Sequence, residues 1–225
     1  MMKKTLFYST LLIILSCHKK DQQSITNYPI HKDITVSYFW IGEAGNSDNK
    51  DIPNSQSVWD DKWKEHYGGL DDPENRNGYQ PANFTPNENP FYFALPYNDF
   101  KSRSGKRKKH AMQDVYWSNE KNWQSNESLC KNRWIKITKG NTICYAQWED
   151  AGPFGENDWQ YVFGDNDKKP KNRTNNHAGL DVSPAVKDYL NLDDLDKVSW
   201  QFINESDVPD GPWKSIITIS NVFWE

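Results

Sequence analysis

Histidine and cysteine are scarce in this chain of 225 residues, which has five of the first and three of the second. No two histidines stand at the spacing of a zinc-ligand pair, so we expect no metal site and no cofactor. No histidine is placed locally to activate Cys130 or Cys144, which argues against a thiol nucleophile. Basic residues do not outnumber acidic ones, since the formal net charge is −4, and this argues against nucleic acid as a partner.

Long apolar runs are missing from most of the chain, and the clearest one lies at the N-terminus. The run from Leu6 to Leu15 follows two lysines and is too short to cross a bilayer, which is typical of an export signal. Ile14-Leu-Ser-Cys17 resembles a bacterial lipobox, which implies removal of residues 1–16 and membrane anchoring through a lipid on Cys17. The residue after Cys17 is His18 and not an Asp, which favours the outer membrane as the destination of the lipoprotein if the cell has one. An ordinary signal peptide with a chance cysteine is the alternative.

Aliphatic residues are also few, whereas aromatic residues make up 14% of the chain and include 11 tryptophans. Rings must therefore do much of the core packing in a chain that is only 36% hydrophobic. Many rings together with many Asn and Asp residues are typical of a secreted, carbohydrate-facing β protein. An aromatic β core with polar loops explains the same composition without any ligand.

The length of the chain allows one domain with long insertions. We expect a polar tether over 17–33 and a single domain over 34–225, in a protein that is a monomer. Polar, turn-rich stretches predict insertions at 44–90, 101–130 and 157–176. A basic run opens the second insertion and fits either an anionic partner or a solvated loop.

Alternating apolar residues predict strands, and one helix carries clear start signals. Ser183 is a good N-cap and Pro184 suits the first helical position, so a short helix is expected over 184–190. A helical turn is expected within 57–67, with two tryptophans facing inward. Strands are expected at 34–40, 134–138, 142–148, 198–203 and 216–219, with a further short strand at 159–163 and an apolar segment at 90–96.

Cys130 and Cys144 form an even pair once Cys17 is set aside, and in an exported chain such a pair favours a disulfide. Cys130 lies just before the predicted hairpin of 134–138 and 142–148, and Cys144 lies within it. A bridge between the two would attach the preceding insertion to the hairpin.

Two motifs organise the chain, and each of them carries an acid at the end of an element. The stretch Cys144-Tyr-Ala-Gln-Trp-Glu-Asp-Ala-Gly-Pro-Phe-Gly155 begins as a strand and ends with Asp150 on a Gly-Pro turn. Strand alternation puts Trp148 on the same face as Cys144. The stretch Ala178-Gly-Leu-Asp-Val-Ser-Pro-Ala-Val186 places Asp181 just before the helix start.

Together with the Trp-containing strand at 198–203, these motifs resemble a double-psi β-barrel, and they are similar to the bacterial expansins and the rare-lipoprotein-A-like proteins. The resemblance is strongest over 134–220, and the middle of the chain does not match. It implies a mainly β fold, a six-stranded double-psi β-barrel with one short helix near 184–190 and long loop insertions.

The resemblance also implies a site. The expansin comparison implies that the acid matching Asp181 contacts cell-wall glycan without hydrolysing it. The rare-lipoprotein-A comparison implies that the acid matching Asp150 belongs to a lytic transglycosylase site, where one Asp can act as acid and base because a sugar hydroxyl is the nucleophile. We therefore expect both acids, as catalytic candidates, to approach each other across one groove. The expected substrate-binding residues are Tyr38, Trp40, Asp99, Trp148, Phe154 and Trp200.

The chain departs from the related families at two places. Tyr38 is followed by Phe39 and Trp40, where barrel endoglucanases carry the Asp that acts as general base, and the nearest acid is Glu43. No histidine stands in the segment 91–99, where rare-lipoprotein-A-like proteins carry one. The first departure argues against an inverting hydrolase, because the base that activates water is missing or moved. Together the two departures favour a non-catalytic protein over a glycan-active one.

Each acid also has a purely structural explanation. Asp181 could stabilise the N-terminus of the helix that follows it, and Asp150 could accept N–H groups of its turn. Two classes therefore stay open. The first is a glycan-binding or glycan-cleaving protein that uses the Asp150/Asp181 groove, and the second is a non-catalytic envelope lipoprotein whose barrel serves protein interaction or structure.

Overall fold

The computed structural model describes residues 28–47, 49 and 52–225. The predicted signal over 1–16, the lipidation site Cys17 and most of the predicted tether lie outside the described residues. Among the residues that are described, no helix is long and apolar enough to span a bilayer.

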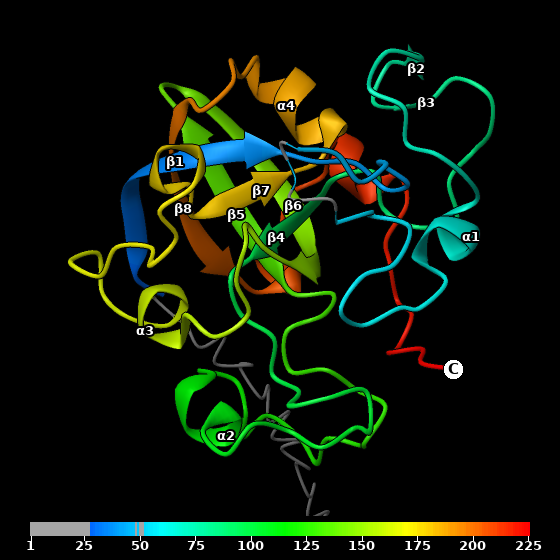
Figure 1. Ribbon diagram of the computed structural model, residues 1–225. Coiled ribbons are helices and arrows are strands. Elements are labelled where there is room, and N and C mark those ends of the chain that lie inside the picture. The colour runs from blue at the N-terminus through cyan, green and yellow to red at the C-terminus, as the bar shows by residue number, and fades with distance from the viewer. Residues whose placement is uncertain (1–27, 48, 50–51) are drawn as a thin grey trace, which may run out of the picture.

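Six strands close into a mixed β-barrel in the order β1-β7-β4-β6-β5-β8 (Figure 1). Two neighbouring pairs, β1 with β7 and β4 with β6, run parallel, and the other four pairs run antiparallel. The predicted mainly β class and six-stranded barrel are confirmed. The barrel strands are β1 (Ile30–Tyr38), β4 (Tyr92–Leu95), β5 (Trp134–Lys139), β6 (Thr142–Ala151), β7 (Leu180–Val182) and β8 (Lys197–Ile203).

The other elements are short. The Ser183 hydroxyl accepts a hydrogen bond from the Val186 N–H at 3.3 Å and so caps α4, which spans the residues predicted for the helix. Outside the barrel lie α1 (Trp63–Tyr67), α2 (Ala111–Asp114), α3 (Trp159–Val162), α4 (Pro184–Leu190), the hairpin of β2 (Arg76–Asn77) and β3 (Gln80–Pro81), and three 3₁₀ turns at Asn175–His177, Glu205–Asp207 and Pro212–Lys214.

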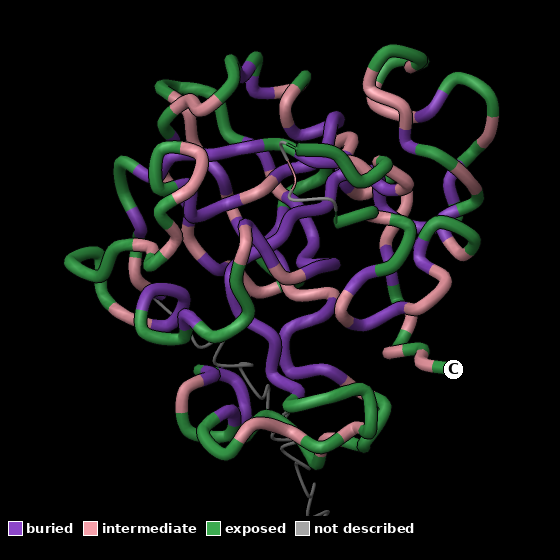
Figure 2. Tube along the Cα trace, viewed as in Figure 1, coloured by how far each residue is buried: buried purple, intermediate pink, exposed green. Residues whose placement is uncertain are grey.

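Aromatic rings fill the barrel, whose walls are largely buried (Figure 2). Trp148 stacks against Phe93 and against Phe202, with ring centroids 5.9 Å apart in both pairs. A second, smaller core lies beside the barrel, where Trp63 of α1 packs edge-on against Tyr92 at 5.5 Å. This second core attaches the long first insertion to the outside of β4.

The strands predicted at 159–163 and 216–219 are wrong. The first segment forms α3, and the second is irregular. A closed barrel pairs every strand edge, so a further strand finds no backbone partner. Thr218 shows the consequence, because its N–H donates to the side-chain oxygen of Gln147 at 2.8 Å instead of to a strand carbonyl. The sixth place in the barrel is taken by β7, which carries Asp181.

The predicted disulfide is also wrong, because Cys130 and Cys144 are free, buried thiols. Cys144 lies opposite Ile137 of β5, whereas Asn132, two residues after Cys130, donates its N–H to the Trp148 carbonyl. The turn that follows Cys130 therefore meets β6 four residues beyond Cys144, roughly 13 Å away at ~3.3 Å per residue. A disulfide requires Cα atoms within about 7 Å, so the two thiols lie too far apart along the strand to bond.

Candidate functional site

A groove of about 1220 Å³ lies over the ends of β1, β4, β6 and β7. Ala94 of β4 is its central floor residue, because it pairs with Asp150 of β6 on one side and with Asp181 of β7 on the other. Neighbouring strands lie about 4.8 Å apart, so the Cα atoms of the two acids are separated by roughly 10 Å. The fold thus brings both predicted acids to one groove, where β4 lies between their strands and the methyl side chain of Ala94 lies between the two carboxyl groups.

Asp150 is 8% exposed, and its Oδ1 accepts a hydrogen bond from the Val58 N–H at 2.8 Å. Burial raises the pKa of the Asp150 carboxyl to about 7, against the opposing effect of the Val58 hydrogen bond. The negative charges of Glu156 and Asp181 add to the rise. A group with this pKa exchanges a proton near neutral pH, as a general acid or base must.

Asp181 receives a hydrogen bond on Oδ1 from the Ser37 hydroxyl. Its Oδ2 faces Gly152 so closely that a Cβ added there would lie 3.2 Å from the oxygen. Burial raises the pKa of the Asp181 carboxyl to about 7, opposed by the Ser37 hydrogen bond and reinforced by Glu43. Within the described part of the chain, no hydrogen bond reaches Oδ2, so this oxygen is available to a ligand in the groove.

We expect Asp181→Asn to raise the melting temperature, and to do so more at pH 8 than at pH 5. The pKa of Asp181 is about 7 in the folded protein against an ordinary 3.8, so folding takes up a proton and stability falls as the pH rises from about 4 to 7. Asparagine carries no charge and escapes this loss. Calorimetry at the two pH values measures the effect, and an equal or negative shift at both would contradict it.

The groove rim carries aromatic rings. Tyr38 and Trp40 stack with their ring centroids 5.8 Å apart and their planes 26° apart, and Phe154 contributes a third, partly buried ring to the lining. The Lys187 ammonium lies 5.2 Å from the centroid of the Tyr38 ring. Stacked, partly exposed rings offer a flat apolar face of the kind on which a sugar ring can lie.

The lining is acidic. Among the described lining residues, Glu43, Glu156 and Asp194 join the two floor acids, against one basic side chain, Arg103, which pairs with Asp61. This balance disfavours an anionic ligand because like charges repel across a confined space. In the part of the chain that the structure describes, no three His, Cys, Asp or Glu side chains are arranged to hold a metal ion.

Three predicted groove residues lie elsewhere. Trp148 and Trp200 are at most 1% exposed in the core, and Trp200 stacks on His31 at 4.0 Å. Asp99 is fully buried and accepts hydrogen bonds from the Ser128 hydroxyl at 2.6 Å and the Leu129 N–H at 2.9 Å. These three side chains cannot contact a ligand in the groove, because an apolar ring is drawn into the core and a buried carboxylate is drawn to donors.

Sequence reasoning missed several lining residues. Ser37 and Gly152 are the most important, since one holds the Asp181 carboxyl and the other leaves room for it. Neighbouring acids and amides from loops complete the set. The sequence signal was weak, because loop residues far apart in the chain meet only after folding. These lining residues include Glu43, Asn46, Asn49, Asn54, Gln56, Asn157 and Asn175.

No protein-family model matches the sequence, and no curated protein matches it either.

Proposed function

We propose that this chain is an exported lipoprotein of the bacterial envelope whose barrel binds and remodels cell-wall glycan in the Asp150/Asp181 groove. One observation carries the proposal. Two carboxyl groups with pKa values of about 7 flank Ala94 on the floor of one groove, beside a stacked pair of aromatic rings. Rings to hold a sugar and acids to move a proton are the parts that glycan chemistry needs.

The geometry favours Asp181 as the proton donor, because its Oδ2 is available and faces the groove. Repulsion between the two acids means that once one is ionised the other keeps its proton more firmly. Asp181 would protonate the glycosidic oxygen, and ionised Asp150 would stabilise the positive charge that develops on the sugar. The Asp181 carboxylate left by this transfer would then accept the proton of the sugar hydroxyl that attacks the anomeric carbon. One residue would thus serve as acid and base, as in lytic transglycosylases, with no separate base to activate water.

The proposal includes the double-psi topology and the lipid on Cys17. The two parallel pairs, β1 with β7 and β4 with β6, support an interlocked barrel of the expansin and rare-lipoprotein-A-like kind. The acidic lining supports a neutral or cationic glycan over one rich in uronic acid or phosphate.

Pelleting with purified peptidoglycan, followed by chromatography of the released fragments, tests binding and cleavage separately. We expect Trp40→Ala to weaken binding about tenfold, which corresponds to ~1.4 kcal/mol, because it removes half of the stacked pair. Trp159→Ala is the matched control, since that ring is 40% exposed on α3 and does not line the groove. Equal losses in both variants, or no binding by the unaltered protein, would refute the proposal.

A non-catalytic lipoprotein is the second candidate, favoured by the role of Asp150 in attaching the first insertion through the Val58 N–H. In that case binding of a protein or glycan would persist without fragment release. The same chromatography distinguishes the two.

A further inference from the structure

The direction of Asp150 depends on a β-bulge. Phe93 pairs with Trp148, but the next residue of β4, Ala94, pairs with Asp150, so Glu149 is an extra residue in β6. Trp148 points into the core, and regular alternation would send Asp150 to the same face. The extra residue shifts the alternation by one, which turns Asp150 from the core to the groove.

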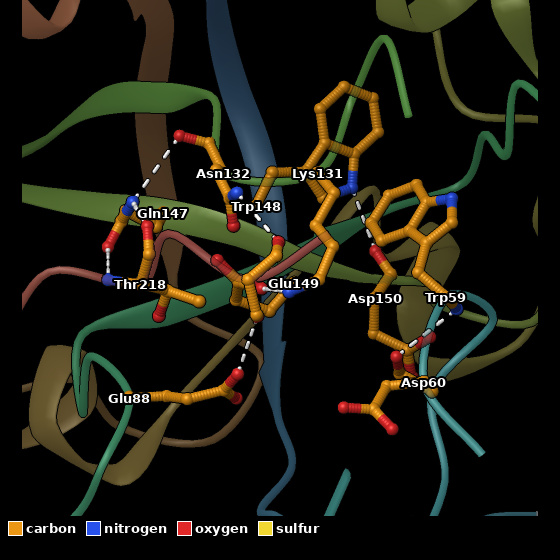
Figure 3. Close-up of polar contacts among 12 residues, drawn as sticks. Trp59, Asp60, Glu88, Lys131, Asn132, Gln147, Trp148, Glu149, Asp150 and Thr218 are labelled. Atoms are coloured by element: carbon orange, nitrogen blue, oxygen red, sulfur yellow. Dashed lines mark hydrogen bonds and ion pairs between the residues drawn. The ribbon is translucent and has the colours of Figure 1, made fainter. Parts of the chain in front are cut away.

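A buried ion pair lies at the bulge (Figure 3). Lys131 Nζ is 2.5 Å from Glu149 Oε2, and the two side chains are 2% and 1% exposed. Their removal from water offsets much of their mutual attraction, so stability alone gives little reason for a charged pair here. The second carboxyl oxygen of Glu149 has no hydrogen bond among the described residues, and the negative charge of Glu88 repels the Glu149 carboxylate.

Two further contacts fix the local backbone. The Trp148 indole N–H donates to the Asp150 carbonyl at 2.8 Å, on the core side of the bulge (Figure 3). The Lys131 backbone N–H donates to the Ser128 hydroxyl at 3.0 Å, and that hydroxyl donates to buried Asp99 at 2.6 Å. Asp99 therefore fixes the turn at Ser128, and this turn holds Lys131 next to Glu149.

We propose that Lys131 and Glu149 are positioning residues, which hold the bulge in β6 and thereby direct the Asp150 carboxyl into the groove. A charged pair suits this task better than an apolar one, because it ties a single residue of β6 to a single point on the neighbouring turn. Its effect on turnover rests on the proposed function, whereas its effect on the orientation of Asp150 does not.

The amide of Val58 reports that orientation directly, because its N–H donates to Asp150 Oδ1. In the unaltered protein we expect the Val58 amide resonance to titrate with a midpoint of about 7. Lys131→Met/Glu149→Leu replaces the pair by apolar side chains of similar volume that can stay folded. We expect this variant to lose the Val58 titration and to release glycan fragments ~10²-fold more slowly, as a misplacement of about 1 Å does.

Two more variants make the test decisive. Glu149→Gln keeps the hydrogen bond to Lys131 and should keep the Val58 titration. Ser128→Ala loosens the turn that holds Lys131 and should weaken the Val58 titration, which gives a second test if the double variant does not fold. Lys121→Met/Glu127→Gln, an ion pair in the same segment, is the control and should leave the resonance unchanged. An unchanged Val58 titration in a folded Lys131→Met/Glu149→Leu or Ser128→Ala variant overturns the inference. Absence of glycan turnover in the unaltered protein overturns only the proposed function.

Discussion

Asp181→Asn is expected to reduce the release of fragments from peptidoglycan by a factor on the order of a hundred or more, with binding retained. Asparagine keeps the shape of the side chain and can still accept the hydrogen bond from Ser37, but it has no proton to give to the glycosidic oxygen. Fragment release measured by chromatography, alongside pelleting for binding, separates loss of chemistry from loss of affinity.

The pH dependence of turnover is a second test of Asp181 as the proton donor. The pKa of Asp181 is about 7, so the protonated acid is lost and turnover declines as the pH rises through that value. Asp193→Asn, an exposed acid that does not line the groove, is the control and should follow the unaltered profile. Full turnover in both Asp181→Asn and Asp150→Asn would refute a catalytic groove.

Lys131→Met is expected to lower the free energy of unfolding by ~3–5 kcal/mol at pH 8, the usual effect of leaving one charge of a buried pair without its partner. Glu149 would remain 1% exposed with its charge unpaired. Burial already raises the pKa of Glu149 to about 7. Loss of Lys131 would raise that pKa further, so the folded protein would bind a proton more tightly and the stability loss should shrink toward pH 5. Urea unfolding at both pH values measures it.

Lys131→Met/Glu149→Leu completes the comparison of the single variant with the double variant. Adding Glu149→Leu to Lys131→Met removes the unpaired charge and should return the stability to within ~1 kcal/mol of the unaltered protein or above it. Lys121→Met, in a partly exposed pair, should change the stability by less than ~1 kcal/mol. A double variant as unstable as Lys131→Met would show that packing, and not an unpaired charge, is responsible.

Sequence alone determined the features that depend on neighbouring residues. Ser183 and Pro184 predict α4 to the residue, because a cap hydroxyl and a fixed φ act on the adjacent turn. Asp150 before Gly-Pro and Asp181 before Ser-Pro are placed at element ends by the same kind of local chemistry. The strands β1, β5, β6 and β8 follow from alternation, and so does the mainly β class. The short strand β7, which carries Asp181, was not predicted.

Tertiary structure decided everything that depends on a partner distant in the chain. Closure of the barrel left no edge for 159–163 or 216–219, and it placed Trp148 and Trp200 inside. Strand pairing separated Cys130 from Cys144 along β6. Above all, the bulge at Glu149 turned Asp150 toward the groove against the alternation of its own strand. A strand pattern predicts two faces, but only the register with a neighbouring strand determines which face a residue after a bulge will take.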